Sequence, residues 1–292
     1  MTGVAVLETV SIVTPLAVRF RDEATLSFVA ADLSVVVYPQ GVPELATAGA
    51  VNRSGLFVFR NLPGLRAVER GGGDADFWAA NPPRFPFVLS VRDTSGRFLP
   101  YSLAVLLPQR RVLGIGAVSP VASPPLAQTG SDTAFLPLFS AASRPLPEGM
   151  AALRTELFEI DRPAAWAVVE ATAGDRRTVT GLADAAGRVL LPLPYPKPPL
   201  LLGSPLGSPL GASGPLTQQS WPVAFSVRYR RRDPVPALPD LVDVLTQPTV
   251  TAWQETSRAT SWTSAILRYG SELVLTSRAP GAGASSTLLV TP

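Results

Sequence analysis

The chain has 292 residues, of which 46% are hydrophobic and 16% charged, so it can bury the core of one large or two medium domains. Its formal net charge of +3 is too small to indicate a nucleic-acid partner. It contains no cysteine and no histidine, which excludes disulfides, thiol chemistry and imidazole ligands and removes the usual general base at neutral pH.

We expect no Sec-type signal at the beginning of the chain. Residues 1–7 hold no basic side chain, and the first basic residue is Arg19. No run reaches the roughly 20 apolar residues of a membrane helix. We therefore expect a cytoplasmic protein with no signal peptide and no membrane span.

In chain order, the first half reads as short strands between turns. Phe77 and Trp78 follow a glycine-rich segment, residues 71–76, that predicts a flexible loop, and Trp78 is a candidate interface anchor. A tight turn at Thr94–Arg97 predicts a hairpin. Strands are predicted at residues 7–13, 16–20, 26–29, 33–38, 56–59, 85–93 and 98–107.

Residues 113–147 are rich in proline and have little periodicity, which predicts a connecting segment. The second half has low-complexity segments at 192–199 and 204–211, which predict a long loop. Strands are predicted at 150–159, 221–228, 264–276 and 286–290, and a short helix at 240–245.

Two segments of the chain repeat one another. Phe-Pro-Phe-Val-Leu-Ser-Val-Arg at 85–92 corresponds to Trp-Pro-Val-Ala-Phe-Ser-Val-Arg at 221–228. Upstream, the glycine turn at Gly55 corresponds to the one at Gly187, and residues 33–38 correspond to 165–170. Each half then has the order strand, long turn, glycine turn, strand, loop and strand. This order indicates an internal duplication of an all-β unit.

The predicted fold class is therefore all-β. We expect two tandem, similar β-sandwich domains with long Pro-rich loops and a C-terminal β extension. The predicted boundaries are 1–113 for the first sandwich, 114–147 for the Pro/Ala/Ser-rich connection, 148–245 for the second sandwich and 246–292 for the C-terminal strands.

Several predicted strands are apolar on both faces, as at Val35–Val37 and Leu56–Phe59. A strand with one wet face alternates, whereas a continuous apolar run indicates cover on both sides. The cover is either another part of the chain or another subunit, so a homo-oligomer within an assembly is one expectation.

Candidate chemistry is sparse. Glu156, Glu159 and Asp161 form the densest acidic group, for which acid–base work and solvated acids at a strand end are the two interpretations. Asp74 and Asp76 suggest a calcium site or a plain turn. We predict no catalytic, cofactor-binding or metal-binding residue and no cofactor.

One basic cluster stands out in the sequence. Arg230, Arg231 and Arg232 are consecutive and follow the strand predicted at 221–228. They are interpreted either as a solvated turn or as interaction residues. Together with Phe77 and Trp78 they complete the predicted interaction residues.

Residues 52–64 read Asn-Arg-Ser-Gly-Leu-Phe-Val-Phe-Arg-Asn-Leu-Pro-Gly. This glycine turn, strand and Leu-Pro-Gly turn resemble the carboxypeptidase-regulatory-like, transthyretin-like β-sandwich. Residues 184–189 resemble it more loosely and lack the final Leu-Pro-Gly. The resemblance implies a fold rather than a function.

The whole chain also resembles proteins encoded with phage-tail-like contractile injection systems, in residues 137–145, 219–223 and 288–292. This resemblance implies a non-enzymatic structural subunit at a tail end (cap or terminator) or baseplate, with tube, sheath or cap proteins as partners. The alternative is a surface- or glycan-binding β-sandwich module that uses the loops around Trp78 and Ser204–Gly211. A third interpretation, a hydrolase, requires activity that is lost when Glu156 or Glu159 becomes Gln.

Overall fold

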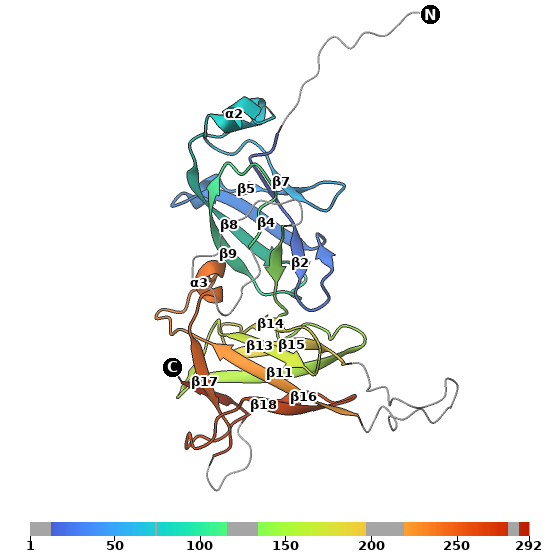
Figure 1. The fold of residues 1–292 in the computed structure, drawn as a ribbon. Coiled ribbons are helices and arrows are strands. Elements are labelled where there is room, and N and C mark those ends of the chain that lie inside the picture. Colours follow the sequence, from blue (N-terminus) through green and yellow to red (C-terminus); the bar gives the residue numbers. More distant parts are fainter. Residues whose placement is uncertain (1–12, 74, 116–133, 197–218, 280–285, 292) are drawn as a thin grey trace, which may run out of the picture. The chain divides into compact units, whose positions relative to one another are not determined.

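The computed structural model describes residues 13–73, 75–115, 134–196, 219–279 and 286–291 (Figure 1). The described part is mostly strand, and the predicted all-β class is confirmed. Its helices are short: η1 (Pro43–Leu45), α1 (Arg66–Gly71), α2 (Ala75–Ala79) and α3 (Leu241–Leu245). Two predicted features, most of the strand at 7–13 and the loop at 204–211, lie outside the described residues.

The chain forms two compact units that no single cut in the sequence separates. Unit 1 comprises Met1–Arg21, Phe28–Arg92 and Ser102–Pro137. Unit 2 comprises Asp22–Ser27, Asp93–Tyr101 and Leu138–Pro292. Two short segments from the first third of the sequence therefore belong to the unit built mainly by the second half.

The strands of the first part form three small sheets, with orders β5-β4-β8-β9, β1-β7-β6 and β10-β2-β3. Alternation along β8 buries Phe87, Leu89 and Val91 on one face, as the sequence pattern predicts. The strands are β1 (Leu16–Val18), β2 (Phe20–Asp22), β3 (Phe28–Val29), β4 (Leu33–Pro39), β5 (Thr47–Ala48), β6 (Ala50–Val51), β7 (Phe57–Phe59), β8 (Phe85–Asp93), β9 (Tyr101–Leu107) and β10 (Leu136–Leu138).

Three local predictions in this part are wrong. The glycine-rich segment before Phe77 is not a simple loop, because α1 ends within it and α2 begins at Ala75. Gly72 ends α1 by donating its N–H to the carbonyl of Val68. The strand expected from residue 98 begins at Tyr101, and the predicted connection contains β10, whose three residues are all buried.

Unit 2 contains a larger, branched sheet. Its main path is β12-β11-β20-β17-β16-β13-β14, with β15 and β19 pairing β11 and β18 pairing β16 (Figure 1). The strands are β11 (Met150–Glu159), β12 (Arg162–Pro163), β13 (Val168–Ala173), β14 (Val179–Leu182), β15 (Arg188–Pro194), β16 (Ser220–Arg228), β17 (Thr249–Trp253), β18 (Ser264–Arg268), β19 (Leu273–Val274) and β20 (Leu288–Thr291).

The core of unit 2 joins strands that are far apart in sequence. Leu153 on β11, Val189 on β15 and Val223 on β16 are 0–2% exposed and belong to one apolar cluster, together with Val290 on β20. The residues predicted as a C-terminal extension thus supply strands to this sheet. The strand predicted at 264–276 is two strands, β18 and β19, and the sequence analysis did not predict β17.

The predicted duplication appears in the strand pairing. Antiparallel pairing joins β1 to β7 in the first part and β11 to β15 in unit 2. Likewise β5 pairs β4, and β14 pairs β13. The strands that carry the repeated sequence, β8 and β16, each pair the same relative partner, β4 and β13. Five strands of each half therefore occupy equivalent places.

The glycine turn is repeated down to individual hydrogen bonds. Asn52 Oδ1 accepts from the N–H groups of Ser54 (2.9 Å) and Leu56 (3.0 Å), and Gly55 N–H donates to the carbonyl of Asn52 (3.0 Å). In unit 2, Asp184 Oδ1 accepts from the N–H groups two and four residues later (2.8 and 2.9 Å), and Gly187 N–H donates to the carbonyl of Asp184 (3.0 Å). Both turns need a short side-chain acceptor followed three residues later by glycine.

Candidate functional site

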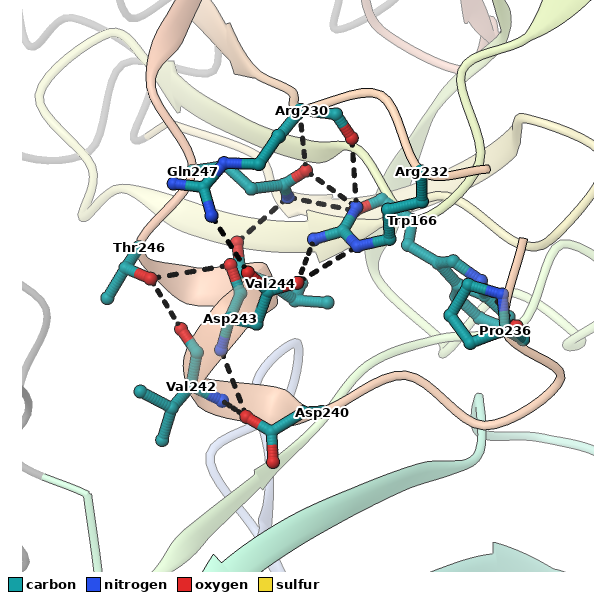
Figure 2. A network of polar contacts seen from close by, with 10 residues as sticks. All are labelled: Trp166, Arg230, Arg232, Pro236, Asp240, Val242, Asp243, Val244, Thr246 and Gln247. Atoms are coloured by element: carbon teal, nitrogen blue, oxygen red, sulfur yellow. Dashed lines mark hydrogen bonds and ion pairs between the residues drawn. The ribbon is translucent and has the colours of Figure 1, made fainter. Parts of the chain in front are cut away.

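The predicted arginine cluster follows β16, and two of its members, Arg230 and Arg232, contact α3 (Figure 2). Asp240 caps this helix by accepting from the N–H groups of Val242 and Asp243 (3.0 and 3.1 Å). The cap places the carboxylate of Asp243 in the first turn. Arg230 Nη1 donates to Asp243 Oδ1 (3.0 Å), and Arg232 Nη2 donates to Oδ2 (2.8 Å).

Gln247 ties this cluster to the core of unit 2. Its Oε1 accepts from the N–H of Arg230 (2.8 Å) and Nη1 of Arg232 (3.0 Å). Its Nε2 donates to the carbonyls of Trp166 (2.9 Å) and Val244 (2.8 Å). Gln247 is 3% exposed, and its two bonds to the carbonyls of Trp166 and Val244 are buried.

The three arginines therefore differ in what they do. Arg230 and Arg232 hold α3 against the end of β16, and the side chain of Arg232 is only 10% exposed. Arg231 is exposed and makes no hydrogen bond or ion pair to the residues that the structure describes. Its guanidinium is the one in the cluster with its donors still available to a partner.

Phe77 and Trp78 lie in unit 1, on α2. Their rings meet edge to face with centroids 5.3 Å apart, and Trp78 Nε1 donates to the carbonyl of Gly72 (2.7 Å). Both side chains are half-buried. The pair therefore fixes α2 beside the end of α1, while part of each ring remains in contact with solvent.

The acidic group predicted at the end of β11 does not converge. Glu156 and Glu159 are three residues apart on one strand, so their side chains leave opposite faces. Glu159 accepts from the hydroxyl of Tyr229 at 3.4 Å. Burial and the neighbouring Glu159 carboxylate raise the pKa of Tyr229. Within the described ranges, no three acidic side chains form a group that could hold a metal ion; Asp74 lies outside those ranges.

Sequence reasoning missed an open cleft in unit 2, of about 440 Å³. Its residues come from positions as distant as 99 and 286, so no local sequence signal marks it. Two arginines and two acids face apolar walls in this cleft. It is lined by Leu99, Ala141, Ala142, Ser143, Arg154, Thr155, Glu156, Asp184, Arg188, Val189, Val274 and Ser286.

Sequence reasoning also missed an open sheet edge on β18. Pro222 of β16 lies opposite Ile266, has no N–H, and gives its carbonyl to the N–H of Gly174 (3.0 Å) on the other side. The N–H and C=O of Ile266 therefore point away from β16. No strand of the described residues pairs with β18 on that side, and Ile266 is 59% exposed.

Comparison with known proteins adds no relative. The chain matches no family model, no curated protein and no solved structure. In the part of the chain that the structure describes, no helix is long and apolar enough to cross a membrane.

Proposed function

We propose that the protein is a non-enzymatic structural subunit of a phage-tail-like contractile injection particle, at a tail end (cap or terminator) or baseplate. The observation that carries this proposal is the open edge of β18. Proteins that work alone protect such edges with charges, prolines, bulges or covering segments. Here Ile266 presents an exposed apolar side chain beside unpaired backbone groups, a combination that suits a strand from another subunit.

Two further features support a scaffold that contacts other proteins. The exposed tip of the β11–β12 hairpin is Ile160, which is 71% exposed and has a φ of +60°. A β-branched residue is costly in this conformation, and such strain clusters at functional positions. The sequence resemblance at residues 137–145, 219–223 and 288–292 supplies the kind of assembly. Its tube, sheath or cap proteins and further copies of the chain are the proposed partners.

The proposal is tested by isolating the tagged chain from its native cells. We expect sheath and tube proteins to co-purify with it. Ile266→Lys places a charge on the open edge and is expected to reduce their recovery at least about tenfold, because an edge charge opposes strand addition. Ser54→Lys adds the same charge to an exposed turn of unit 1 and is the matched control. Recovery of the wild-type chain without particle proteins would refute the proposal.

A surface- or glycan-binding module is the second candidate, favoured by a group of aromatic rings in unit 2. Tyr195 lies 4.8 Å from Tyr269 and 5.7 Å from Trp221, measured between ring centroids. Tyr269 is 37% exposed, so part of its ring is open to a flat ligand such as a sugar. A glycan-array signal from the isolated chain that Tyr269→Ala abolishes would favour this function over the scaffold.

A further inference from the structure

The open cleft of unit 2 combines apolar walls with two arginines and two acids. Leu99 and Val189 are 7% and 2% exposed and form buried parts of the wall, while Val274 is 57% exposed at its mouth. Arg154 and Glu156 leave the same face of β11, because they are two residues apart. The cleft therefore has a hydrophobic lining with charged groups on β11, on β15 and in the turn that precedes β15.

Each arginine that lines the cleft already forms an ion pair with a carboxylate. Arg154 Nε donates to Glu272 Oε1 at 3.1 Å, and its Nη1 donates to the carbonyl of Ala142 at 3.0 Å. Arg188 donates from Nε and Nη2 to Asp184 Oδ2 at 2.9 and 2.8 Å. The second oxygen of Asp184 is occupied by the two backbone N–H groups of its turn.

Glu156 is the acid of the cleft that neither arginine pairs with. It lies opposite Arg188 in the pairing of β11 with β15, yet Arg188 is held by Asp184 four residues earlier in its own turn. Glu156 makes no hydrogen bond or ion pair to the described residues. The two arginines and three carboxylates of this group, Glu272 included, thus carry one uncompensated negative charge.

We propose that this cleft binds an arginine side chain presented by a partner polypeptide. The three methylene groups of the arginine would contact the apolar wall, and the guanidinium would donate to both oxygens of Glu156. An incoming anion would double the charge imbalance, whereas a monovalent cation removes it. Guanidinium suits the site better than ammonium because its planar fork matches the geometry of a carboxylate. It is also more weakly hydrated than ammonium, so removing it from water costs less free energy.

This inference does not depend on the proposed function, because no residue of β18 lines the cleft. The probe is N-acetyl-arginine methylamide, titrated into the full-length chain while the methyl resonances of Val189 and Val274 are followed by NMR. We expect saturable shifts at these two residues. The citrulline analogue has nearly the same shape and no charge. It is expected to bind at least about tenfold more weakly than the arginine probe.

The matched variants are Glu156→Gln and Asp175→Asn. Asp175 is an exposed acid after β13 that does not line the cleft, so its replacement removes the same charge and should leave binding unchanged. Glu156→Gln keeps the side-chain shape and is expected to weaken binding about tenfold or more. Absence of saturable shifts in the wild-type chain, equal binding of the citrulline analogue, or unchanged binding by Glu156→Gln would each overturn the proposal.

Discussion

The ion pair between Asp22 and Arg144 lies almost entirely out of water, with side chains 3% and 9% exposed. Arg144 donates from Nη1 and Nη2 to the two oxygens of Asp22 at 3.0 and 2.6 Å. Thr25 Oγ1 and the N–H of Ala24 also donate to this carboxylate. Burial alone would raise the pKa of Asp22, but these hydrogen bonds outweigh it and hold the pKa below its ordinary value.

This lowered pKa predicts an acid-sensitive contribution to stability. A carboxyl group whose pKa falls on folding stabilises the protein above its unfolded pKa of about 3.9, and that contribution is lost as pH falls through the folded value. At pH 7, Asp22→Asn should lower the free energy of unfolding by about 3–5 kcal/mol, because it leaves the buried Arg144 uncompensated. Urea unfolding should show this difference shrinking below about pH 4.

Asp175→Asn is the control for this measurement, since Asp175 is exposed. Asp93, whose pKa is also lowered despite its partial burial, remains in both proteins and gives a common background. A difference between wild type and Asp22→Asn that stays constant from pH 7 to pH 3 would show that the ion pair does not titrate as described.

At the scale of elements, the two repeated turns offer an internal comparison. Gly55 and Gly187 have φ values of +72° and +78°, in the left-handed region where a side chain is strained. A Cβ at Gly55 would meet nothing within 4 Å, whereas a Cβ at Gly187 would overlap the carbonyl oxygen of Leu157. That carbonyl belongs to β11, and the N–H of Leu157 donates to the carbonyl of Gly187 (2.8 Å).

We therefore expect alanine to be tolerated unequally in the two turns. Gly55→Ala should cost about 1–2 kcal/mol, the strain of a left-handed alanine. Gly187→Ala should cost at least about twice as much, because the backbone of β11 must also move. Hydrogen exchange of β7 and of β15 reports the two costs separately. Equal loss of protection in both strands would contradict the difference in packing.

How far the sequence predicts the elements depends on whether their signals are local. β8 and β16 were predicted because alternation and a leading proline are visible in consecutive residues, and α3 because its residues follow Pro239. The helices α1 and α2 were missed because the consecutive glycines at 71–73 indicate a loop, whereas in the fold Gly72 ends α1 and its carbonyl accepts from Trp78 Nε1 on α2. The pairing of β11 with β19 and β20 is parallel and distant, so no local pattern marks it.

The same distinction holds for the candidate sites. The cluster of Arg230, Arg231 and Arg232 is visible as three adjacent letters, but its division into two structural arginines and one free arginine depends on Asp243 and Gln247. The cleft carboxylate Glu156 was noticed as an acid, yet its isolation follows from the turn at Asp184, which captures Arg188. Residue type was predictable, whereas partner choice was set by the fold.

At the scale of the whole molecule, the compact units interleave along the chain. Asp22–Ser27 and Asp93–Tyr101 belong to unit 2, although the 36 residues of Ser102–Pro137, which belong to unit 1, separate Tyr101 from Leu138. These segments bond to the long segment of unit 2, Leu138–Pro292: Leu99 N–H donates to the carbonyl of Phe139 (2.9 Å), and Arg177 donates to the carbonyl of Ala24 (2.6 Å). Unit 2 therefore depends on residues that precede most of it in sequence.

This dependence predicts that a chain of residues 138–292 is less stable than unit 2 within the full-length protein. It lacks Asp22, so Arg144 loses its carboxylate, and it lacks Phe98, whose ring centroid is 4.7 Å from the Arg144 guanidinium carbon. In the full-length protein, Arg144→Met should cost about 3–5 kcal/mol, because it leaves the carboxylate of Asp22 buried and unpaired. In the shorter chain that carboxylate is absent, so the same substitution should cost less than about 1 kcal/mol. Urea unfolding of the four proteins measures the difference, and an equal cost of Arg144→Met in both lengths would show that the early segments do not complete unit 2.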